Sequence, residues 1–184
     1  MSGPRVVAGT AGGLFLTVPK RFPSRPTQDR VKQALFSSLG ARVPGARVLD
    51  LYAGTGSLGI EALSRGAASC TFVESDPRTV PVLKANLEHC HLTGSVVKQD
   101  AAAYLQAAPG AAFDLILLDP PYSKEKCSLD GARILPDLAR VLAPEGLVAW
   151  EHDARNTWQS PSALSVIKTT RYGESALTYL QHCC

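Results

Sequence analysis

From Ala46 onward, short apolar segments alternate with segments of helical periodicity, and this alternation restricts the fold more than any other feature of the chain. Apolar runs of about five residues are typical of buried strands, and each intervening stretch is long enough for a helix. The expected strands are Arg47–Leu51, Cys70–Glu74, Ser95–Lys98, Phe113–Leu118 and Gly146–Trp150, with helices near 57–66, 76–90, 100–107 and 129–142. The pattern predicts an α/β protein with a mostly parallel central sheet.

Beyond Trp150 the pattern changes to two apolar segments that lie close together in the sequence. Ala163–Thr170 and Ala176–Gln181 are expected strands, and Gly173 between them is a typical turn residue. A connection this short joins antiparallel strands. The sequence therefore predicts an antiparallel C-terminal hairpin that closes one edge of the sheet.

The start of the chain lacks the alternation. Arg5–Ala8 and Leu14–Val18 flank a glycine-containing segment, as the strands of a small β-hairpin do. Thr27 follows a proline-rich stretch and is expected to be the N-cap of a helix that runs to about Leu39. This region is predicted to be a hairpin and helix extension of the α/β domain.

The extension and the domain differ in charge, and we divide the chain into an extension over 1–45 and a domain over 46–184. Residues 1–46 contain seven basic residues and one acidic residue, a net charge of +6, whereas residues 47–184 carry a net −3. A basic arm favours a polyanionic partner, because each neutralised phosphate releases condensed counterions. The alternative is a solvated surface patch without a partner.

Hydropathy and cysteine usage exclude several classes of protein. No apolar run approaches the roughly 18 residues that cross a bilayer, so no membrane association is expected. The first residues lack the order of a signal peptide, and apart from the terminal pair the five cysteines are scattered singly. We therefore expect reduced thiols in the cytoplasm and no metal site. The sequence around Cys90, with a histidine on each side, is expected to be an ordinary helix end.

A glycine-containing loop follows the first strand of the predicted domain. Gly54, Gly56 and Gly59 fit the G-x-G-x-x-G pattern, in which glycines let a ligand approach the backbone. Glu74, at the end of the next strand, can accept hydrogen bonds from both hydroxyls of a ribose. Dinucleotides and S-adenosylmethionine both carry such a ribose, so this pattern alone does not distinguish the two cofactors.

Asp50 favours S-adenosylmethionine over a dinucleotide as the ligand of this loop. A carboxylate at the end of the strand would repel a pyrophosphate by about 1 kcal/mol or more in a partly buried cleft. S-adenosylmethionine has no phosphate and carries an ammonium and a sulfonium, both of which a carboxylate attracts. The alternative is that Asp50 caps the loop by accepting hydrogen bonds from backbone N–H groups. We favour ligand contact over this alternative.

The tetrad Asp119-Pro120-Pro121-Tyr122 directly follows the most apolar predicted strand. Ligands of open α/β sheets bind at the carboxyl ends of the strands. Two prolines keep the backbone extended, so the Asp119 carboxylate and the Pro120 carbonyl can face one cleft. Two acceptors suit an exocyclic amine, and Tyr122 can stack on its base, a contact worth about 1–3 kcal/mol. The tetrad therefore predicts a site for the amino group of a nucleobase.

Together, the glycine loop, Glu74, Asp100 and the D-P-P-Y tetrad resemble the Rossmann-like S-adenosylmethionine-dependent amino-methyltransferases. Residues 24–36, SRPTQDRVKQALF, are similar to the R-P-T-x-[DE]-R-V-[RK] signature of RsmD-type bacterial enzymes, which methylate guanine N2 in 16S ribosomal RNA. The segment around Gly173 and the final predicted strand are also similar to that family, so the resemblance extends over nearly the whole chain.

The resemblance implies a role for each motif. It implies direct in-line methyl transfer by a cytoplasmic monomer, on 16S rRNA in the small ribosomal subunit or its assembly intermediate, without a metal. The implied cofactor residues are Asp50, Tyr52, Ala53, Gly54, Gly56, Gly59, Glu74, Asp100 and Ala101. The implied catalytic residues are Asp119, Pro120 and Tyr122, and the implied RNA contacts are Arg25, Thr27, Arg30 and Lys32.

Three other functions stay open on the sequence. Methylation of adenine N6 in DNA or of protein glutamine uses similar tetrads, but these normally begin with asparagine, where this chain has Asp119. A non-catalytic RNA-binding assembly factor would not need the pair of acceptors in the tetrad. An NAD-dependent dehydrogenase is disfavoured by Asp50.

Overall fold

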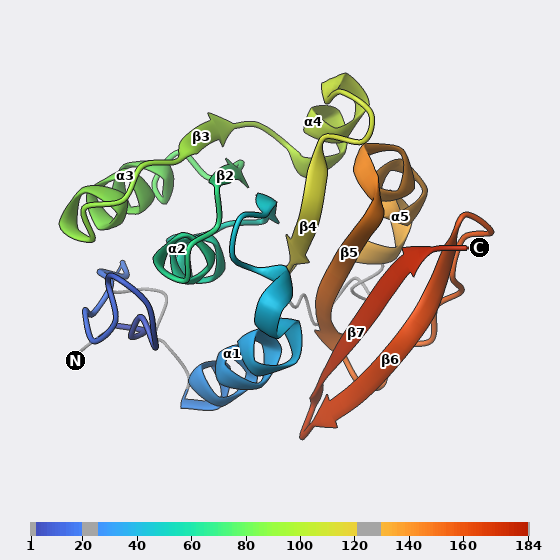
Figure 1. Cartoon of the computed structure of the whole chain (residues 1–184), viewed down its shortest axis with the longest axis horizontal. Helices are drawn as coiled ribbons and strands as arrows, with labels where there is room; N and C mark the ends of the chain where they lie inside the picture. Colours follow the sequence, from blue (N-terminus) through green and yellow to red (C-terminus); the bar gives the residue numbers. More distant parts are fainter. Residues whose placement is uncertain (1–2, 20–25, 121–129, 184) are drawn as a thin grey trace.

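The computed structural model describes residues 3–19, 26–120 and 130–183, which form a seven-stranded sheet with helices on both faces (Figure 1). The strand order is β3-β2-β1-β4-β5-β7-β6; β1 to β5 pair in parallel, and β7 is antiparallel to both β5 and β6. The strands are β1 (Arg47–Leu51), β2 (Ser69–Glu74), β3 (Ser95–Lys98), β4 (Phe113–Leu118), β5 (Leu142–Asp153), β6 (Leu164–Tyr172) and β7 (Ser175–His182). The helices are α1 (Pro26–Leu39), the 3-10 turn η1 (Gly40–Arg42), α2 (Ser57–Ser64), α3 (Val80–His89), α4 (Ala101–Ala107) and α5 (Asp130–Val141).

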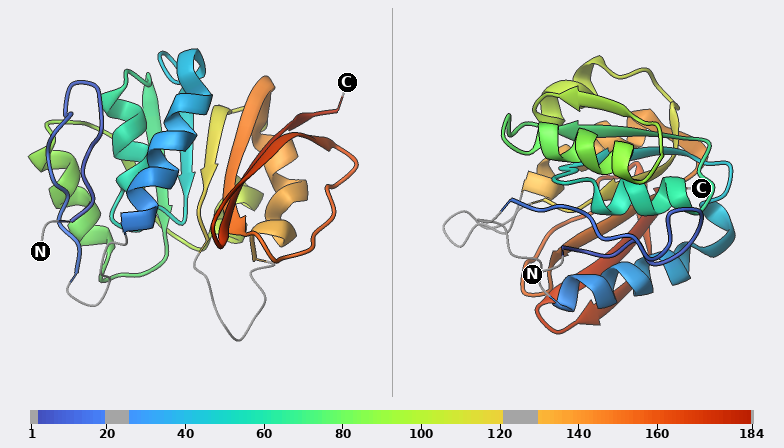
Figure 2. Two further views of the ribbon diagram at one scale, coloured as in Figure 1. Left: turned by 90° about the horizontal axis from the view of Figure 1, so that it is seen from below. Right: turned by 90° about the vertical axis from the view of Figure 1, so that its left-hand side faces the viewer.

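The alternation of side chains along the strands divides the core into two layers, one on each face of the sheet. Val48 packs into a cluster formed with α1, α2, α3 and the N-terminal segment, whereas the next residue, Leu49, packs into a cluster formed with α4 and α5. Figure 2 shows these two groups of helices from further directions. Since β1 and β4 lie in the middle of the sheet, both of their faces are buried, which explains their mostly apolar sequences.

The predicted fold class is confirmed, and three element boundaries need correction. The strand predicted from Gly146 begins at Leu142 and extends to Asp153. The helix expected from residue 76 begins only at Val80, because the Asp76 carboxylate accepts a hydrogen bond from the Arg78 N–H (2.8 Å) and stabilises a turn there. The helix expected near 129–142 begins at Asp130, continues through Pro136 and ends at Val141.

The predicted N-terminal hairpin is present in a short form, and the predicted cap of the helix is wrong. Arg5 and Phe15 form an antiparallel bridge, and the Val6 N–H donates to the Leu14 carbonyl (2.8 Å), but no regular strands form within residues 3–19. Helix α1 begins at Pro26, so Thr27 lies inside its first turn and is not the N-cap. Proline is favoured at the first helical position because the N–H that it lacks would have no partner there. The segment also shares its hydrophobic cluster with the sheet, through Val6 and Leu16.

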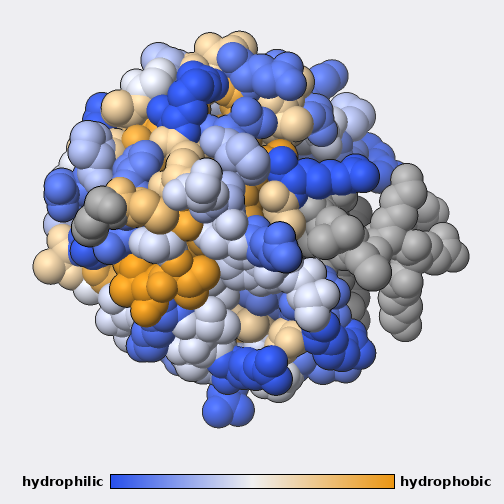
Figure 3. Space-filling view, turned by 90° about the vertical axis from the view of Figure 1, so that its right-hand side faces the viewer, coloured by the Kyte–Doolittle hydropathy of each residue, from blue (hydrophilic) through white to orange (hydrophobic). Residues whose placement is uncertain are grey.

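The outer edge strand β6 carries exposed apolar side chains. Val166 and Ile167 are 45% and 50% exposed, and the strand has an irregular register at this point. Figure 3, which views this side of the molecule, shows an apolar patch among polar residues. Within the parts of the chain that the structure describes, no helix has both the length and the apolar character needed to cross a lipid bilayer.

Candidate active site at the carboxyl edge of the sheet

Three acidic residues lie at the carboxyl ends of adjacent strands. Glu74 ends β2, Asp50 is the penultimate residue of β1, and Asp119 directly follows β4. From β1 the chain runs outward to β2 and β3 and then crosses back to β4 on the other side of β1, so the strand order reverses between β1 and β4. Such a reversal opens a crevice at the carboxyl edge, where ligands of this sheet type bind. The fold therefore brings the predicted cofactor and catalytic acids to one place.

The glycine loop adopts a conformation that requires positive φ angles. Tyr52, Gly54 and Gly56 have φ angles of 59°, 54° and 89°. A Cβ atom on Gly56 would lie 2.2 Å from Leu83 Cδ1, so packing requires glycine there, whereas one on Gly54 would meet nothing closer than 3.9 Å. Gly54 therefore leaves open space next to the loop. The positive φ of Tyr52, a residue with a side chain, is the kind of local strain that accumulates at functional sites.

Asp50 is buried, with 1% of its surface exposed, and its Oδ2 accepts a hydrogen bond from the Gly59 N–H (2.8 Å). Burial raises the pKa of Asp50 to about 7; the Gly59 N–H opposes this shift and the charge of Glu74 adds to it. The loop-capping contact that we considered as the alternative is thus present. Contact between Asp50 and a ligand stays a prediction.

Glu74 and Asp100 both bind backbone N–H groups with their carboxylates. Glu74 accepts from the N–H of Gly54 and of Asp76, each at 2.7 Å, with one oxygen for each bond. A carboxylate has about four acceptor positions, so Glu74 retains capacity for ribose hydroxyls. Asp100 is the N-cap of α4 and is exposed, and the next residue, Ala101, is buried.

Asp119 is half-buried and Pro120 is buried, whereas Tyr122 lies outside the described residues. Burial raises the pKa of Asp119 well above its usual range, and the nearby charges of Glu151 and Asp50 raise it further. Glu151, on β5, is a part of this acidic group that the sequence reasoning missed. The signal was available, because Glu151 directly follows the predicted strand that ends at Trp150.

The predicted RNA contacts separate into different environments. Arg30 is exposed on α1, and Arg25 lies outside the described residues. Thr27 is in the first turn of α1. Lys32 is only 3% exposed, and its ammonium donates to the Arg5 carbonyl oxygen (2.6 Å) inside the protein. A phosphate outside the protein cannot reach this group, so Lys32 is withdrawn from the RNA contacts.

The charge of the site fits a cationic ligand. Among the residues that the structure describes, no ion pair with lysine or arginine involves Asp50, Glu74 or Asp119. No group of three or more histidine, cysteine or acidic side chains within the described ranges is arranged to hold a metal ion. Burial and neighbouring carboxylates raise the pKa values of Asp50 and Asp119, so a positive ligand stabilises their charged forms and a phosphate destabilises them. The residues present therefore fit S-adenosylmethionine better than a dinucleotide.

Gly59→Ala is expected to lower the free energy of unfolding by about 1–3 kcal/mol. The added Cβ would lie 2.3 Å from Phe72 Cε1 and 2.7 Å from Cys70 Sγ, and Phe72 is fully buried. Gly110→Ala is the matched control, since its Cβ would meet only the Arg140 carbonyl oxygen, at 3.5 Å. Urea unfolding compares the two variants, and equal midpoints would contradict the packing argument.

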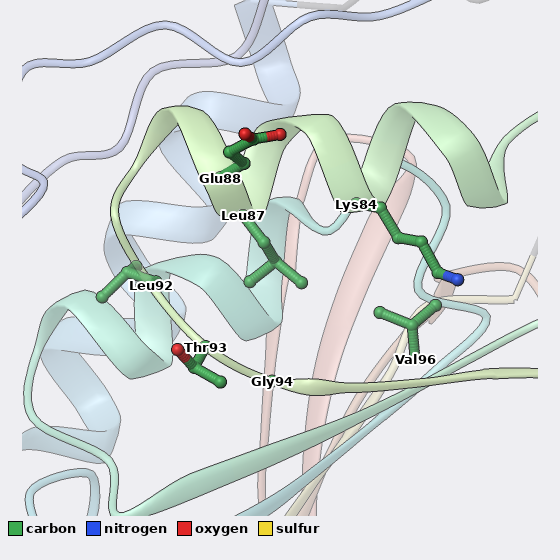
Figure 4. Close-up of a pocket in the computed structure, with 7 residues that line it drawn as sticks. All are labelled: Lys84, Leu87, Glu88, Leu92, Thr93, Gly94 and Val96. Atoms are coloured by element: carbon green, nitrogen blue, oxygen red, sulfur yellow. The ribbon is translucent and has the colours of Figure 1, made fainter.

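A surface hollow lies away from this edge, between α3 and the start of β3 (Figure 4). Leu87 points from the helix toward the strand, and Val96 points from the strand toward the helix. None of the predicted cofactor, catalytic or RNA residues lines it. The hollow is therefore separate from the candidate site.

Comparison with known proteins gives consistent matches over nearly the whole chain. The family model described as Conserved hypothetical protein 95 matches residues 4–181. A candidate rRNA methyltransferase of Bacillus subtilis, YlbH, is 40% identical over 81% of this chain and 82% of its own length. The Ribosomal RNA small subunit methyltransferase D of Haemophilus influenzae is 38% identical over 91% of this chain and 79% of its own. A solved structure of a candidate methyltransferase from Escherichia coli superposes with a TM-score of 0.83 at 31% identity, covering 97% of both chains.

Proposed function

The chain belongs to the RsmD-type family of ribosomal RNA methyltransferases, and on this premise we propose that it methylates N2 of a guanine in small-subunit ribosomal RNA, with S-adenosylmethionine as the methyl donor. The observation that carries the proposal is the position of Asp119 and Pro120. They follow β4 directly, beside Asp50 at the point where the strand order reverses. A pair of acceptors at this point of the sheet suits an amine substrate next to a cationic donor.

The cofactor residues of the proposal lie around the same edge of the sheet. Glu74 holds the ribose hydroxyls, Asp50 and the glycine loop from Tyr52 to Gly59 surround the methionine part, and Asp100 and Ala101 lie at the adenine. When bound, S-adenosylmethionine supplies an electrophilic methyl group on a sulfonium. The open space next to Gly54 and the surplus of carboxylates support this assignment.

Asp119 and Pro120 orient the nucleophile. The carboxylate and the carbonyl each accept a hydrogen bond from one N–H of the guanine amine, which fixes the direction of its lone pair for in-line transfer. Acceptors that draw the amine toward tetrahedral geometry also stabilise the positive charge that develops on nitrogen. Asp119 accepts in its ionised form, which positive charge in the cleft favours despite the raised pKa of the free protein. Tyr122 is assigned to stacking on the base.

RNA reaches the site with its target base unstacked, because a stacked guanine cannot enter the crevice. Arg25 and Arg30 supply contacts to the RNA phosphates. We expect a monomer that acts in the cytoplasm, on the small ribosomal subunit or an assembly intermediate of it.

The deciding experiment measures transfer of labelled methyl groups to naked 16S RNA, small ribosomal subunits, DNA and protein, with mass spectrometry of the nucleosides released. We expect N2-methylguanosine from RNA or from the subunit. Methyladenine in DNA or methylglutamine in protein would show that DNA or protein is the substrate, and would reject guanine in rRNA. Cofactor binding without any transfer would favour the assembly factor.

Neutralising Arg25 and Arg30 together, each to glutamine, should weaken RNA binding and reduce the slope of log affinity against log salt by roughly 1–2. Each arginine that contacts a phosphate releases counterions, so its removal lowers this slope. Arg42→Gln is the control, because Arg42 is exposed at the far end of the same region and donates to the Glu145 carbonyl. Filter binding over a range of salt checks the result, and an unchanged slope in the double variant would reject the phosphate contacts.

A further inference from the structure

Two buried polar side chains that have no part in the proposed chemistry, those of Lys32 and Asn86, contact both the N-terminal segment and the glycine loop. They are 3% and 1% exposed. The N-terminal segment, residues 3–19, lies beside α1 and α2 in both views of Figure 2. Burying an amide or an ammonium is costly unless hydrogen bonds satisfy it, so the partners of these two groups indicate what they hold in place.

Asn86 joins the segment to the residue that precedes Gly56. Its Oδ1 accepts from the Thr17 N–H (2.8 Å), and its Nδ2 donates to the Thr17 carbonyl (3.0 Å) and to the Thr55 carbonyl (2.9 Å). Both amide hydrogens are used, which fixes the orientation of the side chain. Thr55 therefore has a defined position only while Asn86 and Thr17 keep theirs.

Lys32 makes the equivalent connection to the residue that follows Gly56. Its Nζ donates to the Arg5 carbonyl (2.6 Å) and to Ser57 Oγ (3.2 Å), and it lies 3.8 Å from Glu61 Oε2. Glu61 is fully buried and accepts from the N–H groups of Val7 (2.7 Å) and Ala8 (3.1 Å). The ion pair thus anchors α2, α1 and the N-terminal segment to one another.

Gly56 lies between these two attachment points, and its carbonyl accepts from the Ile60 N–H (2.9 Å). Glu74 and Asp50 hold the N–H groups of Gly54 and Gly59 in the rest of the loop. Gly56 has a φ of 89° and is the N-cap residue of α2, and the loop is closed by its N–H, which donates to the Ala53 carbonyl (2.8 Å). A buried ion pair such as that of Lys32 contributes little net stability compared with apolar packing, and its main effect is to favour one conformation over others. Here the conformation that it favours is that of the glycine loop.

We propose that Lys32 and Asn86 are positioning residues, which fasten the two flanks of Gly56 to the N-terminal segment and so set the shape of the cofactor loop. The inference rests on the proposed function in one respect, that this loop binds S-adenosylmethionine. It makes cofactor affinity dependent on a segment that contributes none of the assigned cofactor residues.

The test uses Lys32→Met and Asn86→Leu, which keep the bulk of each side chain and remove its polar groups. We expect each to weaken S-adenosylhomocysteine binding about 10-fold or more in calorimetry, and to raise the KM for S-adenosylmethionine with little change in kcat. Lys32→Arg should restore most of the affinity. Hydrogen exchange of the Gly56 amide in the ligand-free protein should become faster by a similar factor in the first two variants.

Arg65→Gln is the matched control. Arg65 also pairs with Glu61 (2.7 Å), and its guanidinium lies over the Phe36 ring. This variant therefore removes a positively charged partner of the same carboxylate and leaves both flanks of Gly56 attached. We expect normal cofactor affinity even where its melting temperature falls as far as that of Lys32→Met. Equal losses of affinity in Arg65→Gln and the two test variants would show that Lys32 and Asn86 only stabilise the fold, and would overturn the proposal.

Two further outcomes separate the inference from the proposed function. If a test variant does not fold, Ser57→Ala removes one acceptor of Lys32 and leaves its ion pair, and an unchanged Gly56 exchange rate in that variant overturns the proposal. If the wild-type protein does not bind S-adenosylhomocysteine, the proposed function fails, and the exchange of Gly56 still decides whether the loop is anchored. Wild-type binding with unaffected test variants refutes the positioning role alone.

Discussion

Asp119→Ala should lose at least about 100-fold in turnover while it binds S-adenosylhomocysteine with nearly unchanged affinity. The loss corresponds to that of one oriented polar partner in a transition state. In the proposed mechanism Asp119 contacts the amine and not the cofactor, so the effect belongs in kcat. Burial, and then repulsion from Glu151 and Asp50, raise the pKa of Asp119. Removal of the carboxylate relieves both costs, so the variant should not be less stable at neutral pH.

The matched control is Asp114→Ala, on the same strand but at its opposite end. Asp114 is partly exposed and pairs with Arg47 (2.8 Å), which lowers its pKa. An exposed pair of this kind is worth about 1 kcal/mol or less, so turnover should stay near the wild-type value. Single-turnover methyl transfer together with calorimetry makes the comparison. Full turnover in Asp119→Ala would remove the tetrad from the mechanism.

The sequence was sufficient to predict the central strands because burial on both faces leaves a strong signal. Arg47–Leu51 and Phe113–Leu118 have the predicted bounds. The pairing within the N-terminal segment could be predicted, but its position on the domain could not, because distant partners fix it. The N–H groups of Val7 and Ala8 bond to Glu61, more than fifty residues away, and no local pattern encodes such a contact.

The same limit applies to the candidate site. The acids Asp50, Glu74 and Asp119 could be placed at one edge, because they stand at the ends of strands whose parallel order follows from the fold. Lys32 could not be assigned, because a lysine within a basic stretch has the same sequence signature on the surface as beside a buried carboxylate. Only the structure, with Glu61 fully buried 3.8 Å away, distinguishes the two environments.

Asp50→Asn should weaken cofactor binding and stabilise the cofactor-free protein at the same time. Loss of a charged hydrogen-bond partner costs about 1.5–3 kcal/mol, so affinity for S-adenosylmethionine at pH 8 should fall roughly 10- to 100-fold. The asparagine carbonyl can still accept from the Gly59 N–H, so the loop-capping contact survives. A purely structural role for Asp50 would predict no change in affinity and no gain in stability.

The raised pKa of Asp50 explains why Asp50→Asn should stabilise the cofactor-free protein. Because the pKa of Asp50 is raised to about 7 in the folded protein, the native state holds a proton that the unfolded chain has released above about pH 4. The contribution of Asp50 to the stability of the cofactor-free protein therefore falls as the pH rises from about 4 through 7, and Asp50→Asn removes this loss. At pH 8 the variant should unfold with a free energy about 2–4 kcal/mol above wild type, and at pH 4 with nearly the same value.

Cofactor affinity should change with pH in the opposite direction. Ionised Asp50 attracts a cationic ligand, so the wild-type affinity for S-adenosylmethionine should rise between about pH 6 and 8, and in Asp50→Asn this rise should be reduced. Asp114→Asn is the control, since the pKa of Asp114 is lowered by Arg47 and that group stays ionised over this range. Urea unfolding and calorimetry at pH 5, 6, 7 and 8 measure both effects. If stability and affinity both rose in Asp50→Asn, the proposal that Asp50 promotes cofactor binding while it destabilises the folded protein would be rejected.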